Sequence, residues 1–220
     1  MHVQIVLFDG FDPLDAIAPF EVFHAGGMAS GGAVTVELVS AEGPRDVVSG
    51  TGGLSLRATA ALDPTRAGVV LVPGAAGPIG DISEVDNSED TIPVLLGRTL
   101  ETSLPALLKE ALAQPDVLFA TVCGGSLIPA MAGLIEGRHA TTHHGGMDLL
   151  DATGVHAVPA RVVDDGDLVT GAGVTSGLDL GLYLLEREIG PQIAHAVEEL
   201  FAHERRGVVW RNTGPQPAGF

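Results

Sequence analysis

The sequence has little of what would mark a disulfide-bonded, nucleic-acid-binding or membrane-spanning protein. Its single cysteine, Cys123, excludes an intramolecular disulfide and any zinc site built from several cysteines. Lys and Arg number 11 against 28 Asp and Glu, so the net charge is −17, and such a chain repels phosphate backbones and anionic lipids. No apolar run approaches the roughly 18 residues of a membrane span. We therefore expect neither a nucleic acid nor a membrane as a partner.

The remaining composition is that of a globular protein. The 220 residues are 45% hydrophobic, which is enough for a substantial core. The first apolar run, in MHVQIVLFDG, is too short for a signal peptide, and no basic segment precedes it. Together with the lone cysteine, this indicates a cytoplasmic protein. We predict one domain over residues 1–205 and a C-terminal tail over 206–220.

Short apolar runs alternate with segments of helical pattern along most of the chain. Several runs are apolar throughout, which is typical of parallel strands buried on both faces. The pattern predicts an α/β fold, a flavodoxin-like three-layer sandwich with a mainly parallel central sheet. The longer predicted strands are Val3–Phe8, Val34–Ser40, Val69–Val72 and Val117–Val122, and shorter ones are His139–Thr142, Arg161–Val163 and Leu168–Thr170. The predicted helices run from Pro13 to Gly26-Gly27, over 103–114, over 126–137, over 175–188 and over 190–204.

The segment VLFATVCGGSLIPAMAGLIEG carries the strongest chemical signal. A buried strand ends at Cys123, two glycines follow, and a helix begins, as in the nucleophile elbow of several hydrolytic folds. Gly124 and Gly125 supply the small neighbours that such a crowded turn requires. A cysteine near a helix N-terminus is stabilised as a thiolate, and backbone N–H groups there can bind an oxyanion. We therefore predict a reactive thiol rather than a small core residue.

Asp15 has two interpretations. Asp12 is a good N-cap with Pro13 at the first helical position, and this places Asp15 where the second partner of a capping box stands. A carboxyl at a helix start can also carry protons to and from a reacting thiol. The spacing alone favours the capping role.

Four motifs in order resemble the ThiJ/PfpI superfamily, whose members share the class I glutamine-amidotransferase-like fold. The resemblance covers roughly residues 3–188. Within the superfamily the motifs resemble the isonitrile hydratase branch and also the sensor domains of AraC-type regulators. The motifs are LDAIAPFEVF at 14–23, LVPGAAG at 71–77, ATVCGGSLIPAMAGLIEGRHATTHH at 120–144 and LVTGAGVTSGLDLGLYLLERE at 168–188.

The resemblance implies a site that needs no cofactor and no metal. Cys123 corresponds to the nucleophile, and Asp15, in the LDxxxP motif, corresponds to the general acid and base beside it. The backbone N–H groups of Gly74 and Gly124 would form an oxyanion hole. The residues predicted to line the pocket are Ala75, His143 and Thr175. By the same analogy the protein is a homodimer that acts on a small molecule.

The implied reaction is the hydration of an isonitrile to an N-formamide through a covalent thioimidate on Cys123. Members of the hydratase branch carry Thr directly after the nucleophile, whereas this chain has Gly124 and so lacks that hydroxyl. Two alternatives remain: an enzyme of the glyoxalase or deglycase type, and a module without catalytic activity that senses a ligand or oxidant through Cys123. The role of the 77–101 segment, with its acidic stretch 81–90, stays open.

Overall fold

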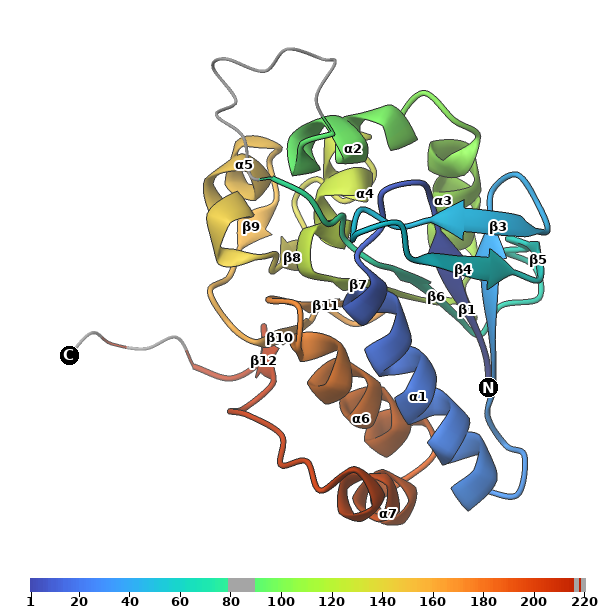
Figure 1. The fold of residues 1–220 in the computed structure, drawn as a ribbon. Coiled ribbons are helices and arrows are strands. Elements are labelled where there is room, and N and C mark those ends of the chain that lie inside the picture. Colours follow the sequence, from blue (N-terminus) through green and yellow to red (C-terminus); the bar gives the residue numbers. More distant parts are fainter. Residues whose placement is uncertain (79–89, 216–217, 219–220) are drawn as a thin grey trace.

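The computed structural model describes residues 1–78, 90–215 and 218. Within this part of the chain, one sheet has the strand order β12-β10-β11-β7-β6-β1-β2-β5, and only the β10–β11 pair is antiparallel (Figure 1). The parallel strands β2-β1-β6-β7-β11 reproduce the flavodoxin-like order 2-1-3-4-5. The bounds are β1 (His2–Leu7), β2 (Thr35–Ser40), β5 (Ala60–Ala61), β6 (Val69–Val72), β7 (Leu118–Val122), β10 (Val162–Asp164), β11 (Leu168–Gly171) and β12 (Trp210–Arg211).

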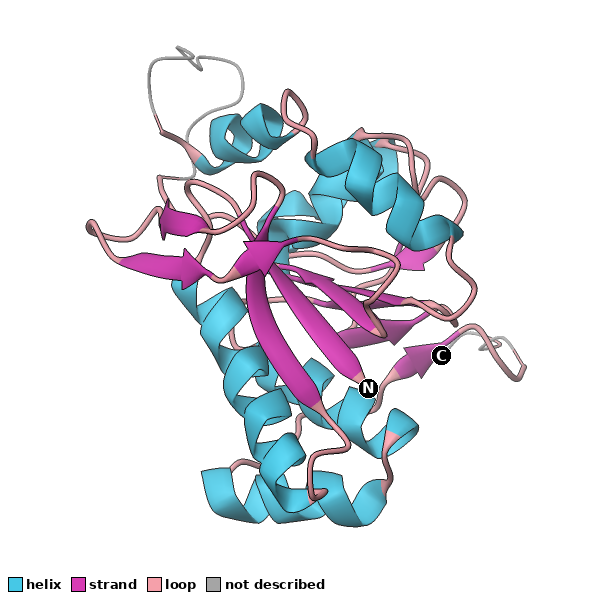
Figure 2. Ribbon diagram, turned by 90° about the vertical axis from the view of Figure 1, so that its right-hand side faces the viewer, coloured by secondary structure: helices cyan, strands magenta, loops and turns pink. Residues whose placement is uncertain are grey.

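Helices cover both faces of this sheet, so the predicted three-layer α/β sandwich is confirmed (Figures 1 and 2). One face carries α1 (Pro13–Ala29), α6 (Ser176–Glu188) and α7 (Pro191–Phe201). The other carries α2 (Ile92–Thr99), α3 (Leu104–Ala113), α4 (Leu127–Met131) and α5 (Met147–Ala152). The smaller elements are the hairpin β3 (Arg45–Val48) and β4 (Ser55–Ala58), the pair β8 (His139–Ala140) and β9 (His156–Ala157), and the 3₁₀ turns η1 (Cys123–Ser126) and η2 (His144–Gly146).

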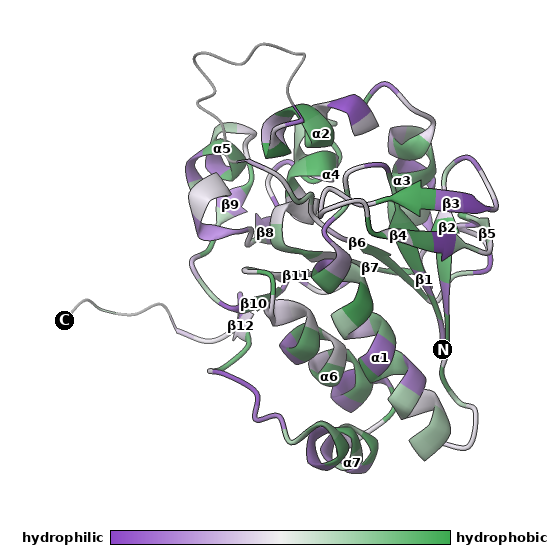
Figure 3. Cartoon of the chain, in the orientation of Figure 1, coloured by the Kyte–Doolittle hydropathy of each residue, from purple (hydrophilic) through white to green (hydrophobic). Residues whose placement is uncertain are grey.

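The central strands are apolar because neither of their faces meets water. Every residue of β6 and β7 is buried. Figure 3 shows the same pattern, with hydrophobic colouring on the central strands. No helix in the described part of the chain is long and apolar enough to cross a bilayer.

Two predicted helix ends are wrong. In both cases a glycine was taken to mark the end of the helix. α1 continues through Gly26 and Gly27 to Ala29. A Cβ on Gly26 would lie 2.6 Å from Leu185 Cδ2, and one on Gly27 would lie 2.4 Å from the Val34 carbonyl oxygen. These glycines therefore allow close packing against α6 and against the segment before β2, rather than ending the helix. Conversely, α4 ends at Met131, well before the predicted end at Gly137.

The sequence pattern missed the β3–β4 hairpin and α5, and it placed a short helix only loosely within 77–101, where α2 lies. The acidic stretch falls almost wholly in 79–89, outside the described residues. The segment 206–220, predicted as a tail, contributes β12, which pairs with β10 through Val163 and Trp210.

A buried acid attaches this C-terminal strand to the domain. Asp164 on β10 accepts a hydrogen bond from the Tyr183 hydroxyl on α6. Its Oδ2 atom also forms ion pairs with Arg187 and Arg211, each at 3.2 Å. One carboxylate thereby connects β10, α6 and β12.

Candidate active site

Cys123 lies on a strained turn at the carboxyl end of β7. Its φ is +55°, a left-handed conformation that non-glycine residues rarely adopt and that often marks a functional site. Two residues later, a Cβ on Gly125 would lie 2.2 Å from the Val72 carbonyl oxygen, so only glycine fits there. The Thr142 hydroxyl donates to the Cys123 carbonyl oxygen at 2.9 Å and holds the turn from the other side. The predicted elbow geometry is therefore present.

Asp15 lies beside this thiol, in the first turn of α1, and is fully buried. Its Oδ2 atom accepts a hydrogen bond from the Gly74 N–H at 2.9 Å, whereas Oδ1 has no hydrogen-bond partner among the described residues. The capping box favoured by spacing is absent, because the Asp12 N–H donates to the Gly74 carbonyl oxygen at 2.8 Å instead. Asp12 itself caps α1 by accepting a hydrogen bond from the Leu14 N–H at 2.9 Å. The Asp15 carboxyl therefore bonds to Gly74 beside Cys123 and does not cap the N-terminus of α1.

The surroundings keep Asp15 protonated at neutral pH. Burial raises the pKa of this carboxyl to about 8, and the negative charge of Asp12 adds to the rise. The Gly74 N–H and the Cys123 side chain stabilise the charged form only in part. Asp15 is therefore a carboxylic acid that holds a proton next to a nucleophile, which is the state a general acid needs.

Cys123 departs from the expectation that a helix N-terminus would favour its thiolate. Burial raises the pKa of the thiol far above its ordinary value, and the Asp15 charge raises it further. A hydrogen bond from the Gly124 backbone acts in the opposite direction but is the weaker effect. The turn that follows, η1, runs directly into the short helix α4, but burial outweighs what this helical segment contributes. At rest, the pair is a neutral thiol beside a neutral acid.

A cavity of about 340 Å³ opens onto Cys123, and we call it the Cys123 cavity. Its lining is mostly apolar, with Asp12 and His143 as the polar side chains besides Cys123. It lies at the carboxyl ends of the strands, near the switch between β1 and β6, where ligands bind in open α/β sheets. Its larger apolar residues are Ile92, Leu96, Leu127, Met131, Leu149 and Val174.

The structure does not bring all the predicted site residues together. Ala75 and His143 line the Cys123 cavity, as predicted for pocket residues, and Gly124, which was predicted as an oxyanion-hole donor, lines it as well. Gly74 requires a correction, because its N–H is bonded to Asp15 and is not available to an oxyanion. Thr175 does not line the cavity, and its hydroxyl accepts a hydrogen bond from Arg161 at 3.1 Å.

Asp12 was missed as a cavity residue. The sequence identified it only as the N-cap of the first helix, which it is. Because the Asp12 N–H is bonded to the loop after β6, its side chain is also held at the cavity wall. No local pattern could have indicated this second role, since it depends on a contact with Gly74, far along the chain.

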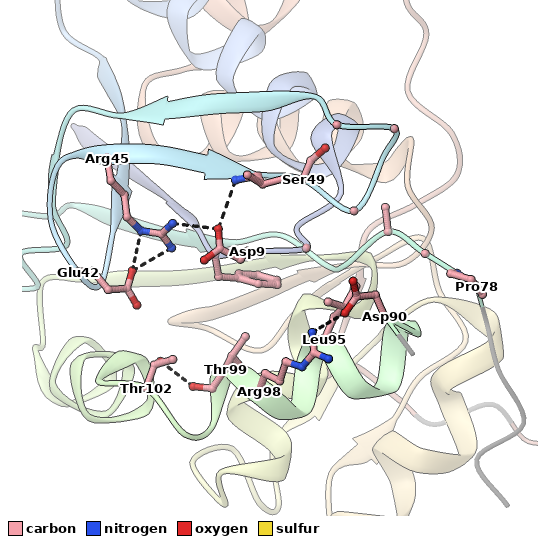
Figure 4. A pocket seen from close by; sticks show the side chains of 18 residues that line it. Asp9, Glu42, Arg45, Ser49, Pro78, Asp90, Leu95, Arg98, Thr99 and Thr102 are labelled. Carbon is pink, nitrogen blue, oxygen red and sulfur yellow. Dashed lines mark hydrogen bonds and ion pairs between the residues drawn. The ribbon is translucent and has the colours of Figure 1, made fainter. Parts of the chain in front are cut away.

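A second cavity, the Arg45 cavity, lies beyond the loop after β6 and has a volume of about 540 Å³ (Figure 4). Each of its two arginines is ion-paired with at least one carboxylate. Arg45 bonds Asp9 at 2.9 Å and also contacts Glu42, and Arg98 bonds Asp90 at 2.5 Å (Figure 4). These charges are already satisfied, so this cavity does not have the reactive character of the first. No group of three or more His, Cys, Asp or Glu suited to a metal occurs in the described part of the chain.

The fold and site define a class: a flavodoxin-like α/β domain with a cysteine on a strained elbow and a buried acid beside it. The model of the DJ-1/PfpI family matches residues 1–187, and the chain belongs to that family. The resemblance found from the four motifs is therefore confirmed.

Curated relatives and solved structures agree with this assignment. The chain is 33% identical to an isonitrile hydratase of Pseudomonas putida over 201 residues, which are 90% of this chain and 76% of the relative. It is 26% identical to the HTH-type transcriptional regulator CdhR of Pseudomonas aeruginosa, over 89% of this chain and 53% of that protein. In fold it is similar to a THiJ/PfpI family protein from Pseudomonas syringae, with a TM-score of 0.74, 24% identity and coverage of 94% of this chain and 76% of the other. Drosophila melanogaster DJ-1beta superposes with a TM-score of 0.73 at 18% identity, over 91% and 97% of the two chains.

Proposed function

We propose that this protein hydrates an isonitrile to an N-formamide, with Cys123 as nucleophile and Asp15 as general acid and base. The observation that carries the proposal is the protonated, fully buried Asp15 beside a strained cysteine that faces an apolar cavity. Support comes from the 33% identity to an isonitrile hydratase over 90% of the chain.

The first step forms a covalent intermediate. Asp15 gives its proton to the terminal carbon of R–NC, and the Cys123 sulfur bonds to the same carbon. The thiol proton passes to the Asp15 carboxylate, so the acid ends the step protonated. The product is a thioimidate, R–N=CH–S–Cys123, which contains all the atoms of the thiol and the isonitrile. Because the acid accepts the thiol proton as it gives up its own, no free thiolate is required.

The second step uses water. The water oxygen bonds to the thioimidate carbon, one of its protons reaches the nitrogen, and the C–S bond breaks. The sulfur leaves with the second proton, relayed through Asp15, and R–NH–CHO is released. The chain has no hydroxyl at residue 124 to hold this water. We therefore expect hydrolysis to be slower than attack, so that the thioimidate accumulates.

The assay is formamide production from cyclohexyl isocyanide and p-nitrophenyl isocyanide. The wild type should turn over at least one of them, Cys123→Ala should abolish turnover, and Asp15→Asn should lower it by orders of magnitude. Asp116→Asn, which removes a carboxylate before β7 at the opposite end of the strand from Cys123, should be as active as the wild type. Mass spectrometry of the quenched wild type should show an adduct equal in mass to one isonitrile. A folded wild type that forms neither formamide nor adduct would overturn the proposal.

The sensing alternative is less well supported by the site. Oxidation of cysteine proceeds through the thiolate, and burial at this site favours the thiol. Peroxide titration separates the two functions. Selective sulfinate formation at Cys123 without any isonitrile turnover would favour a sensor.

A further inference from the structure

Asp12 places a fixed negative charge in the wall of the Cys123 cavity. Its side chain accepts from the Leu14 N–H at 2.9 Å, and its own N–H donates to the Gly74 carbonyl oxygen at 2.8 Å. These bonds hold the residue from both sides, so the partly exposed carboxylate stays at the cavity wall as long as it caps α1. Its charge also reaches the reacting groups, since it raises the pKa of both Asp15 and Cys123.

No cation balances this charge among the described residues that line the cavity. Neither Lys nor Arg is among them. The only basic side chain there is His143, and burial and the neighbouring His144 lower its pKa, so the ring is neutral at neutral pH. The Arg45 cavity is the opposite case, because each arginine there pairs with a carboxylate.

We propose that Asp12 selects the substrates of this site by charge. The cavity admits isonitriles whose substituent is apolar and either uncharged or attached to a cationic group, and it rejects isonitriles that carry a carboxylate or phosphate. The described lining offers no cation to pair with an anion, so an anion would enter without a partner and next to a negative charge. This substrate class rests on the proposed hydratase function, whereas the charge selection is a property of the cavity itself.

A pair of thiol reagents tests the charge selection without requiring turnover. Two methanethiosulfonates transfer a sulfonatoethylthio or a trimethylammonioethylthio group to the Cys123 sulfur. The S–S bond of a disulfide forms, the bond between the reagent's thio sulfur and its sulfonyl group breaks, and methanesulfinate and the thiol proton are released. Cys123 is the only cysteine, so the mass increase reports modification of this residue alone. The rate of each reagent with Cys123 is measured at one pH near neutrality. Each rate is then divided by the rate of the same reagent with a small free thiol. The elevated thiol pKa slows both reagents equally and cancels in their ratio.

The cationic reagent should react at least about tenfold faster than the anionic one with the wild type. Asp12→Asn should reduce this ratio severalfold, because Asn caps the helix as well as Asp but has no charge. Asp116→Asn makes the same change in net charge at the far end of β7 and should leave the ratio unchanged. Asp12→Ser, another neutral N-cap, repeats the test if the Asn variant melts at a lower temperature.

Turnover then tests the substrate class. Isocyanoacetate and its methyl ester differ by one negative charge and little volume. The ester should have the higher kcat/KM. Asp12→Asn should reduce the difference in kcat/KM between the ester and the acid, and it should do so by changing KM. Equal reaction of the two thiosulfonates with the wild type, or an equal effect of Asp12→Asn and Asp116→Asn, would overturn the charge selection. Charge-selective labelling without turnover of either isocyanide would instead reject the hydratase function and leave the selection standing.

Discussion

Asp15 and Asp164 are both almost completely buried, yet their surroundings move their pKa values in opposite directions. Burial raises the pKa of Asp15 to about 8, and no ion pair to it occurs among the described residues. Burial acts on Asp164 in the same sense, but hydrogen bonds from Tyr183 and the Gly166 N–H, together with the charge of Arg187, hold its pKa below the ordinary value. A buried carboxyl with cations stabilises the fold, and one without them retains a proton for chemistry.

The largest expected difference between the two acids is in turnover. Asp15→Asn should lower kcat for isonitrile hydration by about 10²–10⁴-fold, the usual contribution of a general acid or base. Asp164→Asn should leave kcat unchanged in the fraction that is folded, since Asp164 does not line the Cys123 cavity. Steady-state formamide production by both purified variants measures this. Equal losses in the two variants would show that the site does not depend specifically on Asp15.

Stability should show the reverse order. Asp164→Asn removes the carboxylate shared by Arg187 and Arg211, although Arg187 keeps its ion pair with Glu188, and it should lower the free energy of unfolding by roughly 2 kcal/mol. Asp15→Asn replaces a neutral acid with a neutral amide of similar shape and should cost much less. Urea unfolding followed by circular dichroism compares the two. A larger loss in Asp15→Asn would assign that carboxyl a structural role.

The two acids should also give opposite slopes of stability against pH. Between about pH 4 and 8, folded Asp15 keeps a proton that the unfolded chain has released, so its contribution to the free energy of unfolding falls as pH rises. The contribution of Asp164 is present above its ordinary pKa of 3.8 and is lost as pH falls through its lower folded value. The difference in the free energy of unfolding between the wild type and each variant, measured as a function of pH, isolates the slope due to each acid.

Turnover should decline above about pH 8, as Asp15 loses its proton.

Gly124→Thr gives the smallest expected change. A Cβ at this position would lie 3.4 Å from Leu96 Cδ1, which is ordinary contact with the end of a flexible side chain. The added hydroxyl should hold the hydrolytic water and raise kcat severalfold, with stability changed by less than about 1 kcal/mol. Single-turnover kinetics should assign the gain to hydrolysis of the thioimidate. Faster attack with unchanged hydrolysis would contradict the role given to this position.

Much of the fold follows from local sequence pattern. The apolar runs predicted the central strands, and Asp12 with Pro13 predicted the start of α1, because strand burial and helix capping are decided by adjacent residues. The order Cys-Gly-Gly after a buried strand predicted the elbow for the same reason. The end of α1 could not be predicted, since Gly26 and Gly27 are selected by contacts with Leu185 and Val34.

The electrostatics of the site depend on contacts that local pattern does not contain. The bond from Gly74 to Asp15 joins residues far apart in sequence, and it removes Gly74 from the predicted oxyanion hole. The raised pKa of the Cys123 thiol follows from burial under several elements, which outweighs the turn that follows the cysteine. The homodimer expected by fold analogy stays a prediction.

The most direct test of the contrast between the two acids is the titration of their side-chain carboxyl carbons by ¹³C NMR, with Asp15→Asn and Asp164→Asn used to assign the two signals. We expect Asp15 to titrate near pH 8 and Asp164 to remain ionised down to below pH 3.8. If Asp15 instead titrates near its ordinary value of 3.8, it is ionised at neutral pH and cannot serve as the acid that protonates the substrate.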